Sequence, residues 1–205
     1  MTVAITAARR FPNPFRRLAY RAVPLRHFSD FIVVRPLFCA PAGSAGSRYV
    51  VPNGPAALYV ALDADTAYRE LNQDFFRTAR GPLGRSLVRD GQLRPVPCVL
   101  LGILIRTSRL LDLTRTHLLG RRTRRLLGIS NRSDAELLRP WAGLSDSPTQ
   151  MMGNEVFNDG FFEGIIYPSA QNVRHSCLVL FRDRLLPASR IDFHDAPTGI
   201  TDRLP

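Results

Sequence analysis

The sequence predicts a single α+β domain in which a mixed β-sheet is flanked by helices. Two observations predict this class: strand-like apolar runs occur toward both ends of the chain, and helical patterns are grouped between them. The chain has 205 residues, of which 45% are hydrophobic and 22% are charged, as in an ordinary globular domain. About 70% of the unfolded surface becomes buried at this length, so folding requires neither disulfides nor a structural metal.

The first part of the chain predicts an arm, a strand and a loop. Residues 1–18 hold two prolines and four arginines without a clear period, which predicts a loosely held N-terminal arm. The folded domain is therefore expected to span residues 19–205. The run Phe-Ile-Val-Val predicts a strand at 31–34, and residues 36–46, rich in Pro, Ala, Gly and Ser, predict a long loop.

A strand, a turn and a helix follow. Residues 57–62 form a continuous apolar run after a Pro-Asn-Gly-Pro turn, which predicts a buried strand. Asp63 and the polar residues after it supply capping oxygens for a helix over about 64–77. The apolar segments 97–107 and 110–114 predict two strands or one bent strand, so we expect a central sheet.

The second half of the chain predicts helices and then strands. Residues 117–141 predict a helix with a capping box at Ser133 and Glu136 and a stop at Pro140. Residues 149–158 predict a short helix. The three expected strands after it are 164–167, 177–181 and 191–194.

The charge balance is strongly basic. The formal net charge is +11. The sequence contains no lysine, so all 28 residues counted as lysine or arginine are arginines. Arginine pairs with phosphate oxygens in bidentate fashion, which favours nucleotides or nucleic acid as partners. A complete lack of lysine is, however, more typical of a codon bias across a genome. The densest cluster predicts a solvated helix face, with an acidic protein or nucleic acid as alternative partners. It consists of Arg121, Arg122, Arg124 and Arg125.

Common catalytic and metal-binding signatures are absent from the sequence. It contains no GxGxxG, GxxxxGK[ST], HExxH or GxSxG motif. Cys39, Cys98 and Cys177 are far apart, and the four histidines lack metal-ligand spacing, so we expect a reducing compartment and no metal site. No secretion signal is visible, and the longest apolar run, 96–105, is too short for a membrane span. We therefore expect a cytoplasmic protein without membrane contact.

Polar residues at strand ends and in small-residue loops carry a resemblance to a known family. The segments concerned are AYRAVP (19–24), GSRYVVPNGPAALYVALDADTAYRELNQ (46–73), SPTQMMG (147–153) and EGIIYPSAQNVRHSCLVLF (163–181). Together, over residues 19–182, they resemble the RES-domain family of bacterial toxins, whose members degrade NAD⁺ when their antitoxin is lost. Arg48, Tyr59 and Glu70 follow one another at steps of eleven residues, as in that family.

The resemblance implies a set of site residues. It gives catalytic roles to Arg21, Glu70, Ser147 and Ser169, and substrate-binding roles to Arg48, Tyr49, Tyr59, Thr149 and Gln150. Arg35 is the alternative to Arg21, and Ser147 and Ser169 are alternatives for one functional serine. The family usually shows Gly-Gly-Arg-aromatic-Asn around the second arginine, whereas this chain has Gly-Ser-Arg-Tyr-Val. One glycine and the asparagine are therefore missing here.

These residue types suit the cleavage of a dinucleotide's glycosidic bond. Arg21 and Arg48 supply bidentate donors for a pyrophosphate, and Glu70 can stabilise an oxocarbenium-like ribosyl cation. The nicotinamide group of NAD⁺ is already cationic before the bond breaks, so a second carboxylic acid to protonate the leaving group is not required. Tyr59 or Tyr49 can stack on the nicotinamide ring, and a serine hydroxyl can orient the substrate.

Most of these residues also have an ordinary structural role as an alternative. Arg21 and Arg48 fit surface or salt-bridging arginines. Tyr59 fits a core position in its strand, and Glu70 fits a solvated helix face. Ser147 and Thr149 fit helix N-caps, and Ser169 fits a turn after its proline.

By resemblance, the expected activity is that of an NAD⁺ glycohydrolase or NAD⁺ phosphorylase, with water or inorganic phosphate as acceptor. The implied fold is similar to that of ADP-ribosyltransferases, and the implied partners are an Xre-type antitoxin and a second copy in a homodimer. NAD⁺ is the substrate and no separate cofactor is expected. The alternatives are an ADP-ribosyltransferase acting on a macromolecule and a basic nucleic-acid-binding module without enzymatic activity.

Overall fold

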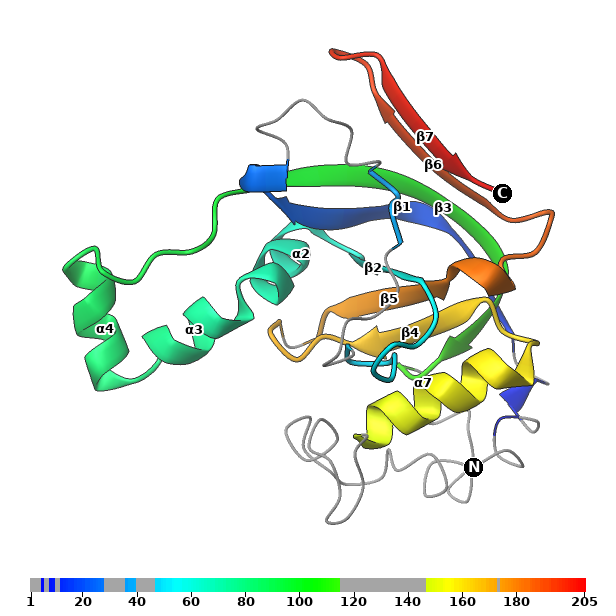
Figure 1. Cartoon of the computed structure of the whole chain (residues 1–205), viewed down its shortest axis with the longest axis horizontal. Helices are drawn as coiled ribbons and strands as arrows, with labels where there is room; N and C mark the ends of the chain where they lie inside the picture. Colours follow the sequence, from blue (N-terminus) through cyan, green and yellow to red (C-terminus); the bar gives the residue numbers. More distant parts are fainter. Residues whose placement is uncertain are drawn as a thin grey trace.

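The fold is a curled, mixed β-sheet with helices packed beside it (Figure 1). The computed structural model describes residues 5, 8–9, 12–27, 36–39, 47–114, 147–172 and 174–205. The strands are β1 (Asn13–Pro24), β2 (Ala57–Ala61), β3 (Cys98–Asp112), β4 (Gly164–Pro168), β5 (Ser176–Phe181), β6 (Arg190–Asp195) and β7 (Ile200–Leu204). The helices are α2 (Ala64–Leu71), α3 (Gln73–Ala79), α4 (Pro82–Arg89) and α7 (Pro148–Asp159), with 3₁₀ turns η1 (Leu25–His27) and η2 (Arg182–Arg184). This mixed sheet with flanking helices agrees with the predicted architecture.

The sheet curls because β1 pairs with strands on both of its sides. The strand order is β1-β2-β5-β4-β3-β6-β7, and β1 also pairs with β3. Strands β1, β2, β5, β4 and β3 therefore form a closed circuit, and β6 and β7 extend from β3. The β3–β4 pairing is parallel, and the other pairings are antiparallel.

Apolar side chains pack on both faces of the sheet. One cluster joins β3 and β5 to β6 through residues such as Ile103, Leu178 and Ile191. The other packs Met152 and Val156 of α7 against the outer face of the circuit. Side chains alternate between the two faces of a strand, so the strands of the circuit separate two cores. The outer core borders the pocket that is described below.

The structure agrees with several element predictions and changes others. The expected strand at 57–62 is β2, and the segments 97–107 and 110–114 form one continuous strand, β3. The expected helix over 64–77 is broken at Asn72, whose side-chain amide donates to Tyr68 O and whose Oδ1 accepts from Val96 N–H at 2.6 Å. Asn72 thereby separates α2 from α3.

Three elements were not anticipated, and two expected ones lie outside the described residues. Strand β1 begins at Asn13, so residues 13–18 of the expected arm belong to the sheet, while the domain boundary at 18/19 stays a prediction. Helix α4 and strand β7 are the other additions. The expected strand at 31–34 and helix at 117–141, with its four-arginine cluster, fall outside the described residues.

Glu163 is a buried carboxylate that joins three segments of the fold. Its side chain is fully buried. Oε1 accepts from the backbone N–H groups of Ser108 at 2.9 Å and Arg109 at 3.1 Å. Oε2 accepts from Leu186 N–H at 3.1 Å and from the hydroxyl of Ser189. Because every partner is a donor, this position requires an acceptor on both oxygens.

We expect Glu163→Gln to lower the free energy of unfolding by about 2–3 kcal/mol, since the new amide group places N–H donors against two existing donors. Urea denaturation monitored by circular dichroism measures the change. The matched control is Asp74→Asn, an exposed carboxylate on α3 whose loss is expected to change stability by less than about 0.5 kcal/mol. Equal effects of the two substitutions would contradict the anchoring role of Glu163.

Candidate functional site

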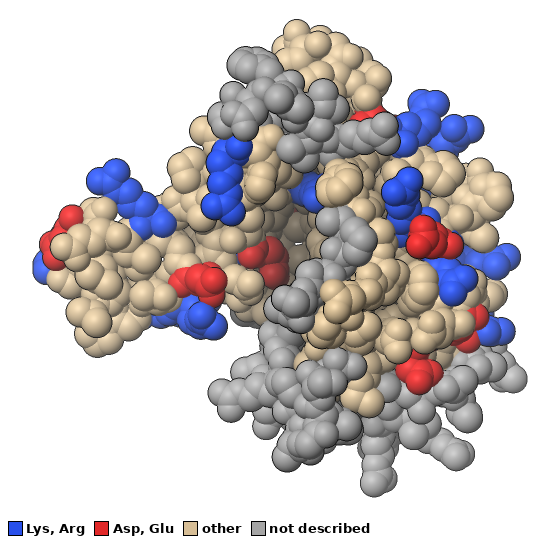
Figure 2. Space-filling model, in the orientation of Figure 1, with Lys and Arg blue, Asp and Glu red and all other residues tan. Residues whose placement is uncertain are grey.

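A pocket of about 450 Å³ opens between β1, α2 and the turn at residues 47–50, a size typical of small-molecule sites. Figure 2 shows a hollow in the surface with an acidic side chain at its edge. The polar side chains among the described lining residues are Tyr20, Arg21, Ser47, Arg48, Tyr59, Glu70, Gln73, Tyr167 and Cys177. The structure therefore brings four of the predicted site residues to one pocket: Arg21, Arg48, Tyr59 and Glu70.

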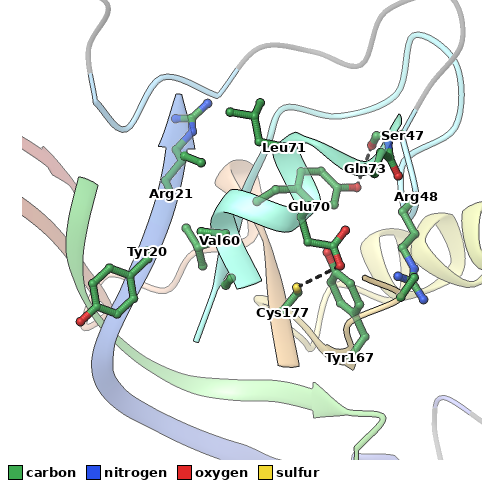
Figure 3. A pocket seen from close by; sticks show the side chains of 15 residues that line it. Tyr20, Arg21, Ser47, Arg48, Val60, Glu70, Leu71, Gln73, Tyr167 and Cys177 are labelled. Atoms are coloured by element: carbon green, nitrogen blue, oxygen red, sulfur yellow. Dashed lines mark hydrogen bonds between the residues drawn. The ribbon is translucent and has the colours of Figure 1, made fainter. Parts of the chain in front are cut away.

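Glu70 is the one carboxylate among the described lining residues. It lies in the last turn of α2, and two side chains hold its Oε1. The thiol of Cys177 donates to this oxygen at 3.7 Å, as Figure 3 shows. The hydroxyl of Ser169 donates to the same oxygen at 2.5 Å. Hydrogen bonds to one carboxylate oxygen fix the orientation of the group and leave the other oxygen available to a ligand.

The hydroxyl of Ser169 is itself oriented by its backbone. Its Oγ accepts from the N–H groups of Gln171 at 3.1 Å and Asn172 at 3.0 Å. Both lone pairs are thereby used, so the single hydroxyl hydrogen is available for Glu70. The predicted turn role of Ser169 and its contact with the pocket carboxylate are therefore both present in the structure.

The segment after Ser169 is attached to the start of α2. The side-chain amide of Asn172 donates to Thr66 Oγ1 at 2.8 Å and to Asp65 Oδ2 at 3.1 Å. His175 Nδ1 lies 2.8 Å from Asp63 Oδ2, and Asp63 caps the helix by accepting from Thr66 N–H at 2.8 Å. These contacts hold the loop that carries Ser169 against the helix that carries Glu70.

Asp63 makes this attachment dependent on pH. Burial raises the pKa of Asp63, but hydrogen bonds from Thr66 and the neighbouring His175 outweigh it, so the net pKa lies below its usual value. A lowered folded-state pKa adds stability that is complete above the unfolded-state pKa and is lost as pH falls through the folded one.

We therefore expect Asp63→Ala to cost about 1 kcal/mol near neutral pH, mainly through the lost N-cap. The difference from the wild type should shrink below about pH 4, because protonation weakens the same interactions in the wild type. Urea denaturation of the wild type and of Asp63→Ala, at neutral pH and below about pH 4, measures this difference in the free energy of unfolding. A difference that stays constant or grows in acid would show that the Asp63 carboxylate does not stabilise the fold.

Arg48 is presented to the pocket by a tight turn. Ser47 and Val50 pair through their backbones, with Ser47 N–H donating to Val50 O at 2.8 Å. The guanidinium of Arg48 lies over the ring of Tyr167, 4.9 Å from its centroid. An arginine on an aromatic face keeps its planar fork extended, and its N–H groups remain suited to phosphate or carboxylate oxygens.

Tyr59 supports this turn from strand β2. Its hydroxyl oxygen accepts from Tyr49 N–H at 3.1 Å and lies 2.7 Å from Ser47 Oγ. Burial raises the pKa of Tyr59, only partly offset by its bonds to Ser47 and Tyr49, so its phenol stays neutral near pH 7. The side chain lines the pocket, and its hydroxyl positions the residues around Arg48.

Arg21 lines the pocket from β1 but points elsewhere. Its Nη1 donates to the carbonyl oxygens of Pro36 at 2.8 Å and Phe38 at 3.0 Å. Figure 3 shows its guanidinium directed along β1 and away from Glu70. Burial lowers the pKa of Arg21, which nevertheless stays charged because an arginine titrates far above neutral pH. Arg35, the alternative arginine, falls outside the described residues.

The other predicted serine lies at the start of α7. Ser147 Oγ accepts from Gln150 N–H, and the Gln150 side chain accepts from Ser147 N–H at 2.9 Å, which completes a capping box. Thr149 Oγ1 lies 3.1 Å from Ser147 Oγ. None of these three is among the described lining residues of the pocket. Tyr49 is likewise buried in the outer core, with its ring 4.6 Å from that of Tyr167.

Tyr167 and Cys177 are pocket residues that the sequence did not single out as functional. They pair across β4 and β5 and point to the same face of the sheet. Burial raises the pKa of the Cys177 thiol well above its usual value, so it is a hydrogen-bond donor to Glu70 rather than a nucleophile. The signal for both was the alternation of the two strands, which places them on the face that carries Tyr59.

The described residues contain no group of three side chains that could hold a metal ion. Within the same ranges, no helix is long and apolar enough to cross a membrane. All three cysteines are free.

The protein is a mixed-sheet domain with a small-molecule pocket lined by Arg48, Tyr59 and Glu70. Comparison with known proteins identifies its family. The family model of the RES domain matches residues 17–198, so the chain belongs to the RES domain family, as its sequence predicted. The fold is similar to that of a chain in the crystal structure of the M. tuberculosis MbcT–MbcA toxin–antitoxin complex. The TM-score is 0.58 at 15% identity, over 99% of this chain and 91% of that one. No curated protein matches the sequence. The likeness to ADP-ribosyltransferases stays a prediction.

Proposed function

We propose that the protein is a toxin that degrades NAD⁺ by breaking the bond between nicotinamide and ribose. The observation that carries the proposal is the Glu70 carboxylate, oriented by Ser169 and Cys177 in a pocket that also presents Arg48. Membership of the RES domain family supports it, as does a fold shared with a chain of a toxin–antitoxin complex. A protein antitoxin is accordingly the proposed partner.

The arginines supply the binding energy for the pyrophosphate. Arg48, held over Tyr167, offers a planar fork to the phosphate oxygens. Arg21 lines the same pocket, but its Nη1 holds the 36–38 segment and its guanidinium points away from Glu70, so it adds positive charge near the pyrophosphate rather than a second placed fork. Arg48 thereby orients the dinucleotide before any bond breaks, which lowers the entropic cost of alignment.

Glu70 acts at the ribose. The C–N bond breaks with its electron pair leaving on nicotinamide, which becomes neutral, and positive charge develops on the ribosyl carbon and ring oxygen. A carboxylate fixed beside the ribose stabilises this cation by its charge or by holding the ribose hydroxyls. Water or phosphate then attacks the ribosyl carbon, and an attacking water releases its proton to the solvent. The aromatic ring of Tyr59, which lines the pocket, suits contact with a flat ring such as nicotinamide.

Product analysis tests the proposal and identifies the acceptor. Purified protein is incubated with NAD⁺ labelled in its adenylate half, with and without inorganic phosphate. Free ADP-ribose in both samples indicates a glycohydrolase, and a phosphorylated ADP-ribose that requires phosphate indicates a phosphorylase. Label attached to protein or nucleic acid indicates a transferase. Label that remains in NAD⁺ under all conditions, with folded protein free of antitoxin, contradicts the proposal.

Alanine substitutions distinguish the two candidate serines. We expect Ser169→Ala to lower kcat by about tenfold or more with little change in KM, because Glu70 loses its shortest hydrogen bond. Ser147→Ala removes a capping box and is expected to lower the free energy of unfolding by about 1 kcal/mol. Steady-state kinetics and urea denaturation are measured for both. A larger loss of kcat in Ser147→Ala, at unchanged stability, would assign the functional serine to α7.

A further inference from the structure

An arginine row crosses the exposed face of the sheet outside the pocket. Arg16 of β1 pairs directly with Arg106 of β3, and Arg106 pairs directly with Arg190 of β6. Directly paired residues of neighbouring strands point to the same face, and the strands lie about 4.8 Å apart. All three side chains are exposed. Three guanidinium groups therefore stand side by side on one face, and we call them the arginine row.

Repulsion within the arginine row lowers the free energy of unfolding of the protein when no partner is bound. Like charges directly opposite each other in a sheet repel, and no ion pair with a described acidic residue relieves them. Asp192 is an acidic residue on this face of the sheet: it pairs with Leu104 in the next row, and its carboxylate is bound by Arg203 of β7. The charge of the Asp192 carboxylate is therefore offset by Arg203, and the face remains cationic.

Apolar side chains lie directly beside the arginine row. Leu18 pairs with Leu104 one row further along the same face, and Leu18 is 49% exposed. The strip continues past Gly102 to Leu100, which is 44% exposed. Tyr20, on the same face, lines the pocket. Rows two residues apart are separated by about 6.8 Å, so one bound segment can cover charge and apolar surface together.

We propose that this face binds an acidic, amphipathic segment of a partner protein. Carboxylates of the segment pair with the arginine row, and apolar side chains cover Leu18 and Leu100. Figure 2 shows several basic side chains, with fewer acidic ones among them, along the side of the molecule where β6 and β7 lie. A segment lying along the strip reaches Tyr20 at the pocket.

The composition of the face distinguishes this partner from two others. A nucleic-acid backbone matches the arginines but leaves the leucines exposed, because phosphates and sugars offer them no apolar surface. A second copy of the same face brings cationic rows near cationic rows, which repel. An acidic amphipathic protein segment satisfies both halves of the face.

Fluorescence anisotropy with three labelled probes tests this inference without any measurement of NAD⁺ cleavage. The probes are a roughly 20-residue helical peptide with glutamates on one face and leucines on the other, the same residues in scrambled order, and a single-stranded oligonucleotide of equal charge. We expect the amphipathic peptide to bind most tightly. Arg106→Glu should weaken its binding about tenfold or more, and Leu18→Ala about threefold or more.

Matched substitutions elsewhere control for net charge and exposed apolar area. Arg85→Glu and Leu83→Ala change exposed residues of α4, which projects away from the sheet (Figure 1), and should leave peptide binding unchanged. Circular dichroism verifies that all four variants fold. The inference is overturned by any of three results: no peptide binding, equal binding of the scrambled peptide, or equal or tighter binding of the oligonucleotide with the same dependence on Arg106. A wild-type dimer that Arg106→Glu dissociates would assign the face to a second copy instead.

Discussion

Replacement of Glu70 by glutamine is expected to lower nicotinamide release from NAD⁺ by about a thousandfold while NAD⁺ binding changes little. Glutamine keeps the size of the side chain and still accepts from Ser169 and Cys177 through its oxygen. It loses the negative charge that stabilises the ribosyl cation. Rapid-quench kinetics measure the cleavage step, and calorimetric titration with NAD⁺ measures binding.

The control for Glu70→Gln is Asp74→Asn, a carboxylate-to-amide change in the neighbouring helix α3. Asp74 is exposed and forms only a surface ion pair with Arg77, so cleavage should keep its wild-type rate. Full activity in Glu70→Gln would place the catalytic charge elsewhere. A parallel loss of binding and cleavage would make Glu70 a binding residue.

The second large effect is expected from Gly153→Ala in α7. A Cβ atom at this position would lie 1.8 Å from the carbonyl oxygen of Tyr49 and 2.6 Å from its carbonyl carbon. Backbone cannot move aside as a flexible side chain can, so α7 and the turn at residues 47–50 must separate. We expect the free energy of unfolding to fall by about 3 kcal/mol, and the affinity for NAD⁺ to fall because Arg48 is displaced.

Gly102→Ala is the matched control for Gly153→Ala. Its Cβ would meet nothing closer than 3.5 Å, an ordinary contact with Leu18, so we expect stability to change by less than about 1 kcal/mol. Urea denaturation compares both variants with the wild type. A Gly153→Ala protein of wild-type stability and affinity would show that α7 does not set the position of Arg48.

The sequence predicted short buried elements better than exposed ones. Strand β2 and helix α7 carry apolar runs and capping residues, and both were predicted within a few residues. The first half of strand β1, residues 13–18, falls in the predicted arm because exposed arginines interrupt its buried positions, and β7 has no buried side chain to indicate a strand. The break at Asn72 could not be predicted, because it depends on a bond to Val96, 24 residues away.

The candidate site shows the same division. The resemblance predicts Arg48, Tyr59 and Glu70 as site residues from their spacing, and the structure brings all three to one pocket. The sequence does not show which of Ser147 and Ser169 is the functional serine, because each fits a family motif and a structural role. Only the tertiary fold places Ser169 against Glu70, 99 residues earlier in the chain.

The most direct test of the account is nicotinamide release from NAD⁺ by the purified wild-type protein, followed by proton NMR. If the protein cleaves NAD⁺ as proposed, free nicotinamide appears at a rate proportional to the protein concentration, together with one new ribosyl product. Folded protein that binds NAD⁺ and leaves it intact, after removal of any bound antitoxin and with phosphate present, would contradict it.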